Sequence, residues 1–494
     1  MLMTEGLPQF DSDGDRLCVK LNKSLYGLKQ APRVWNEVLT SWLVEYGFKQ
    51  SEYDPCLFVN AISGTIILVL IWVDDCIIID NSSTARTAFV SALSKRFRIT
   101  TKPELDWVLG VRITRDLKKC TISMSQSLYI TELYERFYGH LKGMSKSYSI
   151  PAGPEAMHFS RADCPAEKSA EWISMQPFKS VYMTLVGSFI WLFTATVPEI
   201  GFITSMLGRF TDNPARVHLR AAYRVLIYLH GRLSLPLVLG GHTDLTFRVW
   251  VDASWMPDSI TGCLYTVGSS LVDWFTRKQI GGITTAGGIS RSSMAAESRA
   301  AADAGAGGIF IRDLCNELAL LTEVGLGIKT TDLICDSEST IKVRQDVFAC
   351  KRSKSFITDV KSVRDWVLRL IYRFVKIKTT FHHADLMTKP LAIGPFVFHR
   401  DTVLNAKISL PSTDNIESSA FFISSHVYSM PESELSLPWE FMLLSGVSSS
   451  SSSSSTSLVT CSSLSSPTSL VTESSSSSSA AEETNVSSSF SAPP

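Results

Sequence analysis

Apolar residues recur with a helical period in the middle of this chain, and the pattern changes to that of strands near residue 240. Between residues 178 and 239 the apolar positions are spaced by three and four, in YMTLVGSFIWLFTATV, IGFITSMLGRF and HLRAAYRVLIYLHG. This spacing is typical of helices packed on one face. The segment TDNP at 211–214 predicts the start of the third helix, with proline near its first turn.

From residue 247 onward, short alternating segments separated by turn residues predict strands in FRVWVDASW, TGCLYTVGSS and LVDWFTRKQ. An Ala-rich helix is expected over 292–319, a strand over 332–335 and an amphipathic helix over 357–375. Three strands, a helix, a strand and a helix predict a mixed α/β domain. Gly305, Gly307 and Gly308 each cost about 1 kcal/mol relative to alanine inside a helix, so a frayed or kinked helix is expected there.

Composition supports several domains and an intracellular location. The 494 residues are 45% hydrophobic and 19% charged, and their formal net charge is zero, so only local patches can attract nucleic acid. Ten scattered cysteines without a CxxC pair favour reduced thiols. The N-terminus does not resemble a secretory signal, and the apolar runs 65–73 and 185–197 are shorter than the ~20 residues that span a bilayer. We therefore expect a non-secreted protein without a membrane partner, in the cytoplasm, the nucleus or both.

Four acids stand where a metal site would use them. Asp252 and Asp336 each follow an apolar strand, Glu297 lies in the Ala-rich helix, and Asp385 lies in HADL before MTKP. Strand ends are where α/β folds bind ligands, and clustered carboxylates repel unless a cation neutralises them. Hard oxygen ligands suit Mg²⁺ or Mn²⁺. By spacing alone, four ordinary surface acids remain the alternative.

A second acidic feature interrupts an apolar stretch. In VLIWVDDCIII, Asp74 and Asp75 stand between two strand-like runs, where an unpaired buried charge would be costly. Either a metal ion neutralises the pair, or the two acids lie in an exposed hairpin turn.

The sequence resembles the C-terminal part of a copia-type LTR-retrotransposon Pol polyprotein, over roughly residues 5–395. The stretches that carry the resemblance occur in the family's order: LNKSLYGLKQAP (21–32), VDD (73–75), LGV (109–111), YMTLVGS (182–188), DASW (252–255), CDSES (335–339) and ADLMTKP (384–390).

The resemblance implies two metal-dependent sites with Mg²⁺ or Mn²⁺ as cofactor. Asp74 and Asp75 would be metal-binding acids of a reverse-transcriptase palm, while Asp252, Glu297, Asp336 and Asp385 would be the catalytic, metal-binding acids of an RNase H-like domain. The partner would be an RNA–DNA hybrid or a template–primer, and other retroelement proteins are potential partners. In the family's box of Ser-Ser-Thr-Glu-Ala-Glu, the metal-binding second acid is kept as Glu297 and the first is Ala295.

The same resemblance implies a truncated reverse-transcriptase palm and start of thumb (1–145), a helical thumb or connection (146–240) and an RNase H-like α/β domain (241–400). Beyond it we expect an irregular extension (401–446) and a Ser-rich tail (447–494), which should be disordered because it has almost no apolar surface to bury. A polymerase site in this family needs a third Asp on an upstream palm strand, which is expected to be missing. We therefore expect no DNA synthesis by this chain alone. The alternative to an active nuclease is a catalytically dead, nucleic-acid-binding relic.

Basic residues supply candidate contacts to the nucleic-acid backbone, which dominates such binding. Lys29 and Gln30 are expected near the template–primer. Lys361, Arg364 and Arg369 belong to a basic window that also contains Lys351, Arg352, Lys354, Arg373, Lys376 and Lys378, with Trp366 and Tyr372 available to pack or stack. A solvated helix face is the alternative. His382 or His383 could act as a proton shuttle beside the metal ions, or could be an ordinary solvated loop histidine.

Overall fold

The computed structural model describes residues 27–102, 104–255, 259–279, 292–323, 327–345, 356–408 and 455–461. It has the mixed helix-and-strand composition that the sequence predicts. The chain divides into two compact units, and the larger one, Trp42–Cys461, contains all three sheets. Residues 21–26 of the LNKSLYGLKQAP segment, together with Lys351, Arg352 and Lys354, lie outside the described residues.

An antiparallel sheet of six strands, in the order β1-β2-β3-β4-β15-β5, forms the N-terminal part of the larger unit. Aromatic rings of Trp42, Tyr46, Phe48 and Phe89 pack against one another beside it, with centroids 5.1–6.0 Å apart. The elements of this part are β1 (Lys49–Gln50), β2 (Leu57–Ile62), β3 (Thr65–Trp72), β4 (Asp75–Asp80), α2 (Ser83–Arg96), β5 (Ile99–Lys102) and β15 (Ser455–Cys461). The helix before them, α1 (Ala31–Tyr46), begins in the smaller unit and ends in the larger one.

Strand β15 corrects part of the prediction for the C-terminal tail. Residues 447–494 were expected to be disordered, but Ser455–Cys461 pairs antiparallel with both β4 and β5. This segment, STSLVTC, interrupts the serine run with Thr, Leu and Val, and Thr and Val are β-branched residues that favour strands. The rest of the tail, and residues 409–446 before it, lie outside the described residues.

The middle of the chain combines a four-stranded sheet, in the order β6-β7-β8-β9, with a bundle of helices. The three predicted helices are present, although the third begins at Arg216, just after the predicted 211–214. The elements are β6 (Trp107–Val108), β7 (Val111–Asp116), β8 (Thr121–Ser125), α3 (Ser127–Phe137), η1 (Tyr138–Leu141), η2 (Pro154–His158), η3 (Arg161–Asp163), α4 (Ala170–Ala195), η4 (Pro198–Ile200), α5 (Gly201–Gly208), α6 (Arg216–Gly231) and β9 (Leu237–Gly240).

Helix α4 is, within the described part of the chain, the one helix long and apolar enough to cross a membrane by length and composition. Tyr182, Leu185, Phe189 and Leu192 on this helix are fully buried in the large hydrophobic core. The packing accounts for its apolar character as that of a core helix.

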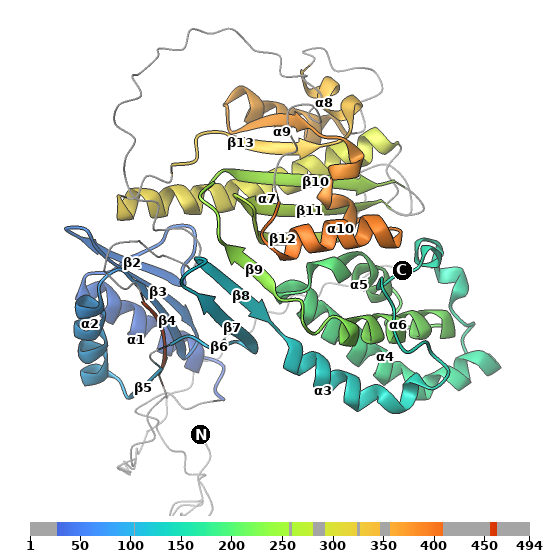
Figure 1. Cartoon of the computed structure of the whole chain (residues 1–494), viewed down its shortest axis with the longest axis horizontal. Coiled ribbons are helices and arrows are strands. Elements are labelled where there is room, and N and C mark those ends of the chain that lie inside the picture. The colour runs from blue at the N-terminus through green and yellow to red at the C-terminus, as the bar shows by residue number, and fades with distance from the viewer. Residues whose placement is uncertain are drawn as a thin grey trace, which may run out of the picture. The chain divides into compact units, whose positions relative to one another are not determined.

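The third sheet has the strand order β12-β11-β10-β13-β14. Strands β10, β11 and β12 are antiparallel neighbours, whereas β13 and β14 run parallel to β10. Helices α7 and α9 pack on one face (Figure 1), and the helical middle with α10 supplies the core on the other. The elements are β10 (Phe247–Ser254), β11 (Ile260–Val267), β12 (Ser270–Lys278), α7 (Ser293–Thr322), β13 (Thr331–Cys335), α8 (Glu338–Gln345), α9 (Ile357–Leu368), β14 (Tyr372–Lys376), η6 (Thr379–Phe381), η7 (His383–Met387) and α10 (Ile393–Leu404).

The prediction for residues 357–375 was wrong in its second half. Helix α9 ends at Leu368, and residues 372–376 form strand β14 at the edge of the sheet. Leu370 has a φ of +58°, a left-handed conformation that ends the helix and starts the turn to the strand. Apolar residues continue at helical spacing across this turn, which concealed the change of element.

The glycines of α7 do not fray the helix, contrary to the prediction, since α7 is one helix from Ser293 to Thr322. A Cβ built on Gly305 would lie 2.5 Å from Trp366 Cζ3, and one on Gly308 would lie 2.5 Å from Tyr372 Oη and 2.9 Å from Val249 Cγ2. These glycines therefore let α7 approach the sheet and α9 closely. The Tyr372 hydroxyl donates to the Gly305 carbonyl at 2.7 Å.

Candidate metal centre

Four segments far apart in the sequence bring their predicted acids to one end of the five-stranded sheet. Asp252 lies on β10, two residues before that strand ends, and Asp336 directly follows the parallel strand β13. Glu297 lies in the first turn and a half of α7, which begins after the Ser292 N-cap, and Asp385 lies on η7. Asp252, Glu297 and Asp385 are only 2%, 8% and 5% exposed, and Asp336 is half-buried.

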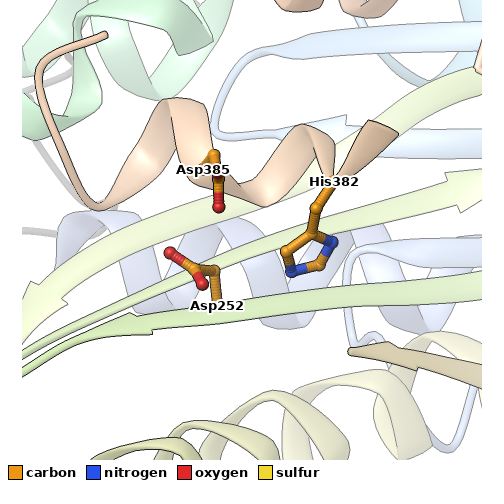
Figure 2. A group of neighbouring side chains, drawn as sticks. All are labelled: Asp252, His382 and Asp385. Atoms are coloured by element: carbon orange, nitrogen blue, oxygen red, sulfur yellow. The ribbon is translucent and has the colours of Figure 1, made fainter. Parts of the chain in front are cut away.

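The geometry joins these acids through Asp252. One carboxylate oxygen each of Asp252, Glu297 and Asp336 lies within 4.8 Å of the other two. Asp252 also belongs to a second group with Asp385 and His382, with the same limit on the distances between ligand atoms. Figure 2 shows the Asp252 and Asp385 carboxylates turned toward each other, with the His382 ring beside Asp252. The structure thus brings together all four acids that the sequence singled out.

Burial and mutual repulsion make this cluster electrostatically strained without a divalent ion. Burial, then the neighbouring Asp252 and Asp336, raise the pKa of Glu297 well above its usual value. Burial, followed by repulsion from Asp252, raises the pKa of Asp385 to about 6. A divalent ion would relieve both effects, because it replaces repulsion between carboxylates by attraction to a shared charge.

Hydrogen bonds orient two of the carboxylates. The Thr388 hydroxyl donates to Asp252 Oδ2, and the Thr379 hydroxyl donates to Asp336 Oδ2 at 2.8 Å. Lys389 is paired with Asp385, with 2.8 Å between Nζ and Oδ1. Thr388 and Lys389 lie within the segment ADLMTKP, whose sequence alone indicates no role for either residue. Partners that orient metal-binding carboxylates are a usual part of such sites.

Replacing Glu297 with glutamine is expected to stabilise the metal-free protein at neutral pH. The folded-state pKa of Glu297 lies above the ordinary 4.5, so its protonated form contributes stability that is complete below about pH 4.5 and is lost as the pH rises toward the folded-state pKa. The variant avoids this loss. Its Tm in EDTA at pH 7.5 should rise by a few degrees, since about 1 kcal/mol shifts Tm by roughly 2–4 °C in a domain of about 200 residues.

The measurement is Tm against pH, with and without MgCl2. Wild type should gain Tm with Mg²⁺ at neutral pH, and Glu297→Gln should not. Glu132→Gln, at an exposed position of α3, is the matched control and should follow wild type. Parallel pH profiles of wild type and Glu297→Gln would contradict this account of the cluster.

Both histidines before Asp385 are buried, so the alternative of a solvated loop histidine was wrong. His382 is fully buried, and its Nε2 lies 2.9 Å from the Val251 carbonyl oxygen, to which it must donate. Burial, followed by the charge of His399, lowers the pKa of His383 to about 3. His383 is therefore neutral at physiological pH and poorly suited to shuttle protons.

The second acidic pair lies in the β3–β4 hairpin. Trp72 pairs with Asp75, so Val73 and Asp74 form the two-residue turn, and both acids are half-buried. Burial, then repulsion from Asp75, raise the pKa of Asp74. Val73 has a φ of +52°, which is strained for a β-branched residue. Among the described residues, no third metal-ligating side chain forms a group with this pair.

The candidate nucleic-acid contacts fall in two places. Lys29 and Gln30 are exposed just before α1 and belong to the smaller unit, Met1–Ser41 with Ser462–Pro494. Lys361 and Arg369 are exposed on and just after α9, where Arg369 Nε lies 3.0 Å from Asp365 Oδ2, and Arg364 is half-buried.

The aromatic residues of this basic window pack against α7 instead of facing solvent. Tyr372 is 1% exposed, and Trp366 lies against Gly305. Their rings are 5.9 Å apart, edge to face. Of the two roles that the sequence allowed for this pair, packing is the one that the structure supports.

The chain matches one protein family and is similar to several known proteins. Residues 4–148 match the family described as reverse transcriptase (RNA-dependent DNA polymerase). The chain is 28% identical over 390 residues to the retrovirus-related Pol polyprotein from transposon TNT 1-94 of Nicotiana tabacum, and 29% identical over 393 residues to that from transposon RE1 of Arabidopsis thaliana. It is 24% identical over 390 residues to the transposon Ty1-NL2 Gag-Pol polyprotein of Saccharomyces cerevisiae.

These alignments cover 78%, 78% and 76% of this chain but only 28%, 25% and 21% of the three relatives. The chain thus spans about a quarter of the length of the relatives it matches. The matched reverse-transcriptase region contains strands β1 to β8, including the hairpin with Asp74 and Asp75. The remaining strands of the first two sheets, β15 and β9, lie outside it.

Proposed function

The chain belongs to the copia-type retrotransposon Pol polyproteins and contains a reverse-transcriptase-like segment, and we propose that its five-stranded-sheet domain cleaves the RNA strand of RNA–DNA hybrids. The observation that carries this proposal is the convergence of Asp252, Glu297 and Asp336, from three different elements, within 4.8 Å of one another. Three hard oxygen donors, two of them on buried residues, fit Mg²⁺ or Mn²⁺.

The donor set suits phosphodiester chemistry. When bound, a divalent ion acts as a Lewis acid that activates water and stabilises charge on the phosphate. Thr388 holds the Asp252 carboxylate and Thr379 holds that of Asp336, so both are oriented before substrate binds. Preorganised groups of this kind need no rearrangement during the reaction.

The sheet supports the assignment of an RNase H-like domain to residues 241–400. Asp252 is on the central strand, and the neighbouring parallel strand β13 carries Asp336 at its carboxyl end. This edge of a sheet is where α/β folds bind ligands. Lys361 and Arg369, exposed near this domain's helical face, would contact the phosphate backbone of the hybrid.

For the N-terminal region we propose a palm and start of thumb over residues 1–145, followed by a helical thumb or connection over 146–240. The Asp74–Asp75 hairpin would need a third carboxylate for a polymerase metal site, and the described residues offer none beside it. We therefore expect no template-directed dNTP incorporation in a primer-extension assay with the purified chain. Robust extension that is lost in Asp75→Asn would refute this expectation.

The decisive test of the nuclease proposal uses one labelled RNA strand in three forms: in an RNA–DNA hybrid, in an RNA duplex and alone. The purified chain should cut the hybrid with Mg²⁺ or Mn²⁺ and not with EDTA, and should leave the other two largely intact. Binding of the hybrid without cleavage in either metal would instead support the alternative, a catalytically dead nucleic-acid-binding relic. Neither binding nor cleavage would refute both.

A further inference from the structure

A lysine ammonium already lies inside the carboxylate cluster. Lys389 Nζ is 2.8 Å from Asp385 Oδ1 and 3.6 Å from Asp252 Oδ2. It comes four residues after Asp385 in the chain, and its backbone amide donates to the Asp385 carbonyl at 3.3 Å. The backbone therefore fixes the root of this side chain close to the acids that its ammonium contacts.

Lys389 distinguishes the two groups of potential metal ligands, which share Asp252. Asp252, Glu297 and Asp336 form one group of potential ligands, and Asp252 and Asp385 belong to the other. Only the second group has Lys389 between its carboxylates. The third member of this group is His382, whose Nε2 donates to the Val251 carbonyl. This nitrogen therefore has no lone pair for a metal.

We propose that Lys389 is the second cation of this site: a single divalent ion binds with Asp252, Glu297 and Asp336, and the Lys389 ammonium takes the place of a second ion between Asp252 and Asp385. This inference rests on the proposed nuclease site, which it makes more specific. It assigns a positioning role to Lys389, since the lysine holds the two aspartates.

One divalent ion and one ammonium nearly neutralise the four acids. Four ionised carboxylates with one divalent ion and one lysine retain a single negative charge. A second divalent ion bridging Asp252 and Asp385 would have to share carboxylate oxygens with an ammonium that is already 2.8 Å from one of them. Like charges at contact distance in a partly buried site repel strongly. Either the lysine or the second ion occupies this position.

The electrostatic environment keeps the ammonium charged. Its two carboxylate neighbours, Asp385 at 2.8 Å and Asp252 at 3.6 Å from Nζ, favour the charged form of the lysine. The side chain is about one-third exposed, whereas the carboxylates of Asp252 and Asp385 are 3% and 7% exposed. Pro390 follows directly and restricts the backbone on the far side of the lysine.

The test is a titration of the purified, metal-free full chain with Mn²⁺, in which electron paramagnetic resonance measures the free ion. Wild type and Lys389→Arg should bind one Mn²⁺ at the site. Lys389→Met should bind two, with affinity at the second position at least about tenfold higher, because a like charge has been removed. Lys407→Met, an exposed lysine just after α10, is the matched control and should behave as wild type.

To identify the site among any surface sites, each titration is repeated in an Asp252→Asn background, and only binding that this change removes is counted. Two such ions in wild type, or one in Lys389→Met, would overturn the role of Lys389 while leaving the nuclease proposal intact. No such ion in any variant would overturn the proposed metal site itself. The wild-type stoichiometry decides the question even if Lys389→Met does not fold.

Discussion

Changing Asp252 to asparagine is expected to lower the rate of hybrid cleavage by roughly 10³-fold or more, in line with the loss of a charged group that stabilises a developing charge in a preorganised site. Asp252 is the one acid that belongs to both groups of potential ligands. Asparagine preserves its size and an acceptor for the Thr388 hydroxyl, so the change removes charge with little change of shape.

The measurement is the single-turnover rate of cleavage of a labelled hybrid with saturating Mg²⁺. Asp273→Asn is the matched control, because Asp273 is an exposed aspartate on β12 of the same sheet and lies outside both groups. The control should stay within a few-fold of wild type. If Asp252→Asn retains the wild-type rate, the cleavage comes from another site or from a contaminating nuclease.

The second large effect concerns the contact of α7 with the sheet. Gly308→Ala is expected to destabilise the domain by about 1–3 kcal/mol, the usual cost of overpacking a filled core. The added Cβ would stand 2.5 Å from the Tyr372 hydroxyl oxygen and 2.9 Å from Val249 Cγ2. Both atoms belong to side chains that are at most 1% exposed, so they have little room to move. The clash should exceed the gain of about 1 kcal/mol in helix propensity.

Urea unfolding followed by circular dichroism measures this effect. Gly187→Ala is the matched control, because Gly187 lies in the interior of α4 and a Cβ there would meet nothing within 4 Å. The same substitution should therefore stabilise the protein at Gly187 and destabilise it at Gly308. Stabilisation at both positions would mean that α7 does not lie close to the sheet.

The acids of the candidate centre were predictable because all four carry one signal, and two of them carry a second. Asp252 and Asp336 terminate or nearly terminate apolar strands, and together with Glu297 and Asp385 they lie in segments that resemble a known family. The first three strands were predicted for a similar reason, since strict alternation bounded by turns leaves little choice of element. Asp252 and Asp336 come together because β10 and β13 pair in parallel.

Features that depend on distant partners could not be predicted in this way. Gly305 looks like a helix breaker in isolation, and only Trp366, about sixty residues later, gives it a packing role. The burial of His382 depends on the Val251 carbonyl of a strand far upstream. Lys389 was visible in the sequence, but its charge has meaning only once Asp252 is placed beside it. Local sequence patterns predict helices and strands, whereas these contacts depend on how the helices and strands pack together.

Crystals of the chain soaked with Mn²⁺ would test the central claim directly, through anomalous scattering recorded at the manganese edge. The account predicts an anomalous peak among the carboxylates of Asp252, Glu297 and Asp336, and its loss in Asp252→Asn crystals. Mn²⁺ peaks elsewhere on the protein with none among these three carboxylates would contradict it.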